Sequence, residues 1–127
     1  MYFDIKSLKG KSVVVYFWAS WNQATAVSDF NKMKLIIGTQ KNVELVCVNL
    51  DKLQADGAKF LQTTPVTGTH LHSAGGLDSP LAIKFGITVL PNMFLVGPDG
   101  KVVSRSVQAT TLEDELKKTA PSKDKDK

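Results

Sequence analysis

The sequence predicts an α/β fold. Residues 13–21 form a nearly unbroken run of β-branched, aromatic and other apolar side chains, which is typical of a strand buried on both faces in a parallel sheet. Residues 22–25 form a polar turn, and apolar residues at helical spacing follow it, so a helix is expected to begin beside the carboxyl end of this strand. Residues 43–50 form a second apolar run. In such a fold the functional site lies at the carboxyl ends of the strands, which points to the turn at residues 22–25.

The first helix is expected to span residues 23–37, because apolar residues recur along one side of it. The stripe consists of Ala26, Phe30, Met33 and Ile37, and the glycine that follows is expected to end the helix.

The middle of the chain predicts a helix and a short extended piece. Residues 52–62 read as a helix, which Gly57 weakens. In the extended piece, residues 69–72, His70 and His72 lie on the same side. A metal site needs further ligands, and the nearby sequence offers none. We therefore expect solvent-facing histidines and no metal site.

The last third of the chain predicts a short helix, two strands and a final helix. Ser79 and Pro80 are typical of a helix N-terminus, and Gly86 is typical of the residue that closes a helix. The remaining elements are strands at residues 92–96 and 101–106, a turn at residues 98–100, and a helix that packs through Leu112 and Leu116.

The composition indicates one domain, residues 1–118, followed by a tail. Residues 119–127 contain Pro121 and, from residue 123, an alternating Lys-Asp repeat, which cannot bury apolar surface, so this tail is expected to be disordered. The formal net charge is +4, but residues 117–127 supply most of it with five Lys and two Asp. The domain itself is nearly neutral, so no nucleic-acid partner is expected. No segment approaches the length of a membrane span, and no direct membrane insertion is expected.

Two stretches of the chain resemble a known family. Residues 16–21, Tyr-Phe-Trp-Ala-Ser-Trp, and residues 74–87 resemble thioredoxin-like proteins, especially the TlpA/ResA-type thiol–disulfide oxidoreductases (redoxin, AhpC/TSA-like). The resemblance spans residues 8–118 and implies a thioredoxin-like fold with a central mixed four-stranded sheet, in the order 2-1-3-4, and helices on both faces. It also implies a cis Leu90–Pro91 bond that faces the active-site turn. Proteins of this type are usually exported, so the resemblance implies an extracytoplasmic domain of a larger exported or membrane-anchored protein.

The two catalytic cysteines of that family are missing. The family carries Cys-x-x-Cys after its first strand, and Asn22 and Thr25 occupy the two cysteine positions here. Disulfide exchange needs a thiolate that attacks and a second thiol that resolves the mixed disulfide, so no catalytic residue is predicted. Asn22 is instead expected to cap the helix. The buried Asp of the thioredoxin branch is also absent, because its position holds Tyr16.

The single cysteine, Cys47, lies between two valines in the second apolar run. A cysteine in such a place is typically a small buried hydrophobe with a raised pKa, so we expect no redox activity and no cofactor. The alternative is a thiol–disulfide oxidoreductase or a peroxidase-type redox protein that uses Cys47 or a cysteine outside this chain.

The predicted function is a degenerate thioredoxin-like domain that binds a protein or an extended peptide. In the family the backbone before the cis proline pairs with an extended substrate, and this pairing needs no cysteine. An exposed Trp beside a helix N-terminus and a rigid turn is typical of a recognition surface, although Trp21 could instead pack partly under its loop. A small anion at the helix N-terminus is a further alternative. The candidate binding residues are Trp18, Trp21, Asn22, Gln23, Thr25, Leu90 and Pro91.

Overall fold

The structure is a computed structural model that describes residues 10–38, 42–99, 101–108 and 110–119. Most of the predicted tail, residues 119–127, lies outside the described residues. No helix in the described part of the chain is long and apolar enough to cross a membrane. Within the described ranges, the following side chains are also left out: Asn22, Gln23, Arg105, Ser106, Lys118 and Thr119.

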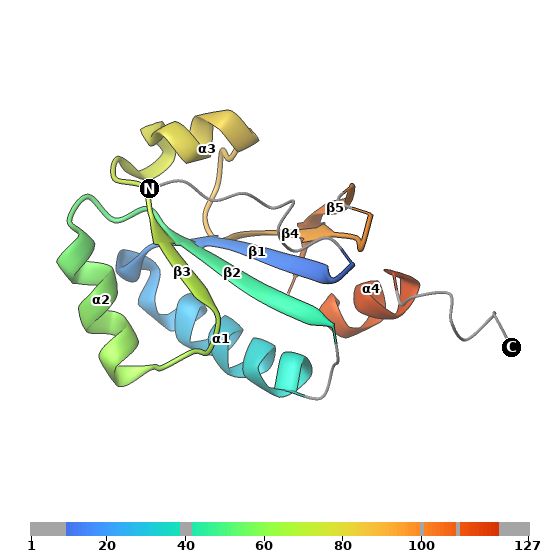
Figure 1. Ribbon diagram of the computed structural model, residues 1–127. Coiled ribbons are helices and arrows are strands. Elements are labelled where there is room, and N and C mark those ends of the chain that lie inside the picture. The colour runs from blue at the N-terminus through green and yellow to red at the C-terminus, as the bar shows by residue number, and fades with distance from the viewer. Residues whose placement is uncertain (1–9, 39–41, 100, 109, 120–127) are drawn as a thin grey trace, which may run out of the picture.

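A mixed sheet of five strands forms the centre of the domain (Figure 1). The strands are β1 (Ser12–Trp18), β2 (Val43–Asn49), β3 (Thr69–His72), β4 (Asn92–Val96) and β5 (Val102–Val107). Their order is β3-β2-β1-β4-β5, with β1, β2 and β3 parallel to one another and β4 antiparallel to both of its neighbours. The α/β class and the order of the four predicted strands are confirmed, whereas the strand count is corrected from four to five.

The additional strand is β3, which lies at one edge of the sheet. It pairs in parallel with β2, from Thr69 opposite Val46 to His72 opposite Asn49. The sequence predicts only an extended piece here, because four residues that include two histidines lack the apolar pattern of a strand. Pairing with β2, rather than local preference, makes this segment a strand.

Helices cover both faces of the sheet (Figure 1). The sheet separates two hydrophobic cores. One core lies between the sheet and helices α1, α2 and α4, and the other lies between the sheet and α3. The bounds are α1 (Gln23–Gly38), α2 (Gln54–Thr63), α3 (Pro80–Phe85) and α4 (Leu112–Thr119), and two single turns, η2 (Ser20–Asn22) and η3 (Gly76–Asp78), come before α1 and α3.

The central strand β1 is buried along its whole length. Tyr16 and Trp18 belong to the core under α1, whereas Phe17 belongs to the core under α3. Because both faces of β1 are covered, its sequence needs no polar alternation. The predicted apolar stripe of α1 is also confirmed, with Phe30 and Met33 fully buried against the first core.

The ends of α3 follow the sequence prediction. The Ser79 hydroxyl oxygen accepts a hydrogen bond from the Ala82 N–H at 3.0 Å, and Pro80 is the first helical residue. Gly86 follows the helix at a φ of 70°, in the left-handed region that glycine adopts without strain. This short helix therefore has both of its ends fixed by local sequence.

Candidate functional site

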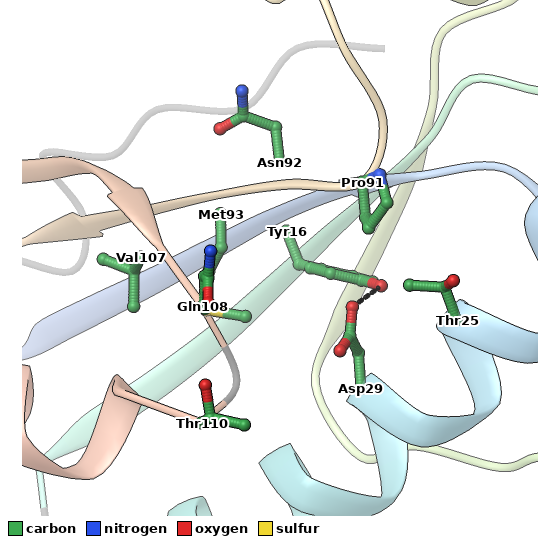
Figure 2. A pocket seen from close by; sticks show the side chains of 9 residues that line it. All are labelled: Tyr16, Thr25, Asp29, Pro91, Asn92, Met93, Val107, Gln108 and Thr110. Carbon is green, nitrogen blue, oxygen red and sulfur yellow. Dashed lines mark hydrogen bonds between the residues drawn. The ribbon is translucent and has the colours of Figure 1, made fainter.

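A cavity of about 270 Å³ lies beside the turn that follows β1 (Figure 2). Thr25, in the first turn of α1, lines it together with Pro91, whose peptide bond to Leu90 is cis. The structure thus places the turn and the proline at one cavity. The other lining residues come from β1, α1, β4 and the segment from β5 to α4: Tyr16, Asp29, Asn92, Met93, Val107, Gln108 and Thr110.

A hydrogen bond joins β1 and α1 at this cavity. The Tyr16 hydroxyl donates to Oδ2 of Asp29 at 2.7 Å (Figure 2). Tyr16 is almost completely buried, and Asp29 is half-buried. Burial above all, and then the hydrogen bond and the negative charge of Asp29, raise the pKa of Tyr16 above its ordinary value. The hydroxyl therefore stays protonated and donates to the carboxylate.

A buried carboxylate fixes the turn at the end of β1. Oδ2 of Asp51 accepts hydrogen bonds from the Ser20 N–H at 2.9 Å and from Nδ2 of Asn49 at 2.7 Å. Oδ1 accepts from the Ser20 hydroxyl at 3.0 Å. Gly57 of α2 packs closely on Asn49, since a Cβ atom there would lie 2.6 Å from the Asn49 side chain. Asp51 thus ties the first residue of η2 to the end of β2.

The two predicted binding tryptophans lie in different environments. Trp18 is 1% exposed, and its ring centroid lies 5.1 Å from that of Phe30 and 5.0 Å from that of Phe60. The prediction that Trp18 binds a partner is wrong, because its position in β1 directs the side chain into the core. Trp21 lies beyond the strand, in η2, and is 65% exposed. Trp21 is therefore available to a partner.

The remaining predicted binding residues are partly described. Thr25 is exposed and Pro91 is half-buried, and both line the cavity. Leu90 is half-buried and packs against the core under α3. The side chains of Asn22 and Gln23 lie outside the description, so the Asn22 cap stays a prediction.

Cys47 is fully buried in β2, opposite Tyr16 of β1. Burial raises the pKa of the thiol far above its ordinary value. The predicted position of this cysteine in the core is confirmed. A protonated and buried thiol cannot act as a nucleophile at the surface.

We expect Cys47 to be unreactive while the protein is folded. Its raised pKa keeps the thiol protonated near neutral pH, and reagents reach it only when the core opens. Labelling by a thiol-reactive maleimide, followed by mass spectrometry, should be at least roughly a hundredfold slower than in guanidinium chloride. Equal rates in the folded and unfolded protein would contradict a buried thiol.

The two histidines are not solvent-facing, which corrects the prediction. Both are half-buried, and each Nε2 atom lies 2.7 Å from a backbone oxygen, that of Val66 for His70 and that of Asp51 for His72. They also line a smaller cavity of about 110 Å³. Within the described ranges, no group of three or more His, Cys, Asp and Glu side chains could hold a metal ion.

Of the nine residues that line the cavity, seven were not among the predicted binding residues, and Asp29 is the charged one among these seven. Asp29 follows Thr25 by four residues in α1, a spacing that places both on the same side of the helix and could have pointed to it. Its bond to Tyr16 depends on how α1 packs on β1, which no local pattern gives. Val89 is 59% exposed and comes just before the cis Leu90–Pro91 bond.

Relatives of this chain are named as thiol–disulfide oxidoreductases. The thiol-disulfide oxidoreductase ResA of Bacillus thuringiensis (strain Al Hakam) is 28% identical over 135 residues, which cover 93% of this chain and 69% of ResA. A Chlorobium tepidum structure assigned as the thiol:disulfide interchange protein DsbE has a TM-score of 0.80 and 25% identity, covering 91% of this chain and 84% of its own.

A further structure is similar in fold alone. It is a secreted disulfide oxidoreductase of Mycobacterium tuberculosis, with a TM-score of 0.74 and 17% identity over 91% of this chain and 87% of its own.

A family model described as thioredoxin-like matches residues 10–102, which is most of this chain. On that match, the chain belongs to the thioredoxin-like family.

Proposed function

We propose that this chain is a redox-inactive thioredoxin-like domain that binds a protein or an extended peptide. The binding surface, called the Trp21/Pro91 face, comprises Trp21, Asn22, Gln23, Thr25, Leu90 and Pro91. The observation that carries the proposal is the arrangement at this face. An exposed tryptophan and a cavity lie beside the two positions where the family has its cysteines, and neither position holds sulfur.

Loss of exchange chemistry follows from the side chains present. Asn22 has no thiol, and the hydroxyl of Thr25 cannot form the mixed disulfide that exchange requires. The single thiol of the sequence, that of Cys47, is buried in β2 with a raised pKa. Neither step of disulfide exchange therefore has a reactive group at this face.

Binding, in contrast, needs only surface that survives without cysteines. Trp21 is 65% exposed four residues before Thr25, and Val89 is 59% exposed two residues before Pro91. Thr25 and Pro91 line the same cavity, whose lining combines polar and apolar side chains. Interfaces typically combine an aromatic anchor of this kind with polar groups around it.

The alternative function is the one named for the relatives, thiol–disulfide exchange. In this chain it would need Cys47 or a cysteine from outside the chain. An extracytoplasmic location is also part of the proposal, and it rests on the relationship to ResA, since proteins of the TlpA/ResA type are usually exported.

A binding experiment tests the proposed function. Peptides selected from a random phage-displayed library against the whole chain should bind Trp21→Ala about tenfold more weakly, because truncating an interface Trp typically costs this much or more. The affinity is measured by isothermal titration calorimetry. Trp21 is mostly exposed, so the melting temperature should change little.

Leu35→Ala is the matched control, since Leu35 is an exposed apolar residue, 74% exposed, in the second half of α1. It should leave peptide affinity unchanged. Selected peptides that bind Trp21→Ala as tightly as the unchanged protein would place the binding surface elsewhere. Failure of every peptide to be enriched would count against a peptide-binding function.

A further inference from the structure

We propose that the cavity beside Pro91 takes a cationic side chain, Lys or Arg, from the bound polypeptide. This inference rests on the proposed function and names the partner's chemistry. The inference is based on the charge, the hydrogen bonding and the size of the cavity. Thr25 and Asp29 line this cavity together with Pro91. None of these three properties entered the sequence prediction.

The described lining of the cavity carries a negative charge. Among the lining residues whose side chains the structure describes, Asp29 supplies the carboxylate, and none is a Lys or Arg. In the described part of the chain, an ion pair joins Lys11 to Glu44, and the hydrogen bond of Asp29 comes from the neutral hydroxyl of Tyr16. A half-buried carboxylate that has no positive partner among the described side chains favours a cation and disfavours the anion considered from the sequence.

The hydrogen bonds leave the carboxylate able to accept more. The Tyr16 hydroxyl occupies Oδ2 of Asp29, and its raised pKa keeps it a donor that adds no second negative charge. A carboxylate has about four acceptor sites, so sites on both oxygens remain for N–H groups. Figure 2 shows the Tyr16 hydroxyl, the Asp29 carboxylate and the Thr25 side chain close together at one end of the cavity.

The remaining lining groups suit an ammonium or guanidinium group. Gln108 and Thr110 contribute an amide and a hydroxyl, each with an oxygen that accepts hydrogen bonds. Met93 and Val107 contribute apolar surface against which the methylene groups of Lys or Arg can pack.

The size of the cavity fits one side chain. Its volume of about 270 Å³ lies below the range of roughly 300–1,000 Å³ that is usual for pockets holding whole drug-sized ligands or cofactors. Pro91 lies at the cavity and within the Trp21/Pro91 face, so a peptide bound along that face can insert a side chain here.

Two sets of probes test the inference separately from the proposed function. The first set consists of short peptides of β-branched residues with blocked ends. These peptides differ only in their central residue, which is Lys, Arg, norleucine or Glu. The second is n-butylguanidinium, a cation without a peptide backbone, followed through the amide NMR signals of Thr25, Asp29 and Gln108. Each probe is titrated into the unchanged protein, Asp29→Asn and Asp78→Asn.

The variants form a matched pair. The amide oxygen introduced by Asp29→Asn would still accept a hydrogen bond from Tyr16, so this substitution should remove the charge and keep the fold. Asp78→Asn removes the same charge from an exposed residue of η3 that does not line the cavity.

We expect the Lys and Arg peptides to bind about tenfold more tightly than the norleucine peptide, which is the usual size of a charged hydrogen bond. This preference should vanish in Asp29→Asn and persist in Asp78→Asn, and n-butylguanidinium should shift the three signals only where Asp29 is intact. Equal binding of the Lys and norleucine peptides would overturn the inference and leave the proposed function standing. Absence of binding by every peptide would overturn the proposed function, and absence of n-butylguanidinium shifts would overturn the cation site.

Discussion

Asn22→Cys combined with Thr25→Cys is expected to give the domain disulfide-exchange activity at least about tenfold above that of the unchanged protein. Asn22 immediately precedes α1, and Thr25 lies in its first turn. The free N–H groups of a first helical turn lower the pKa of a nearby thiol. The unchanged protein has no thiol at this turn. An ordinary cysteine is only a few per cent ionised at neutral pH, so a pKa lowered toward 7 raises the thiolate fraction of a new cysteine about tenfold above that of an ordinary one. The rate is measured as insulin reduction by dithiothreitol.

The control carries hydroxyls in place of the new thiols, as Asn22→Ser with Thr25→Ser, and should show only the background rate. Adding Cys47→Ser to the double cysteine variant should leave its activity unchanged, since Cys47 is buried in β2. A double cysteine variant that folds by circular dichroism and remains inactive would contradict the view that sulfur is the missing component.

Elements encoded by contiguous residues could be predicted from the sequence. The run that became β1 and the stripe that became the buried side of α1 are local patterns, and Gly86 marks a local backbone requirement. The parallel and antiparallel pairing of the sheet came from the family resemblance, not from periodicity. Strand β3 could not be predicted, because its identity depends on pairing with β2.

The tryptophans show why the site was harder to predict than the fold. A strand buried on both faces has no polar alternation, so nothing in the run indicates the direction in which Trp18 points. Trp18 and Trp21 are three residues apart and are 1% and 65% exposed. The strand β1 ends at Trp18, and Trp21 is exposed because it lies in the turn after the strand.

The presence of a carboxylate in the cavity could also not be predicted from the sequence. Tyr16 and Asp29 are thirteen residues apart, and they meet because α1 packs against β1. From the sequence alone, Tyr16 in place of the family's buried Asp indicates that this position has lost its acid. The structure shows that a carboxylate is nevertheless present beside this position, supplied by α1.

Asp51→Ala is expected to lower the free energy of unfolding by about 3 to 5 kcal/mol. The Asp51 carboxylate is 2% exposed and accepts hydrogen bonds from the Ser20 N–H, the Ser20 hydroxyl and the Asn49 amide. Alanine would leave these donors without that acceptor in a region where water enters with difficulty. Urea denaturation measures the loss, which is a large part of the roughly 5 to 15 kcal/mol typical of a domain.

The loss of these hydrogen bonds should also disturb the binding surface, because Ser20 is the first residue of the turn η2, which includes Trp21. Below the melting transition, Asp51→Ala should therefore bind the selected peptides more weakly, although Asp51 does not line the cavity beside Pro91. Asp78→Ala, which removes an exposed carboxylate from η3, is the control and should change stability by no more than about 0.5 kcal/mol. A loss below about 1 kcal/mol for Asp51→Ala would mean that the turn is held mainly by packing, and peptide affinity should then be unaffected.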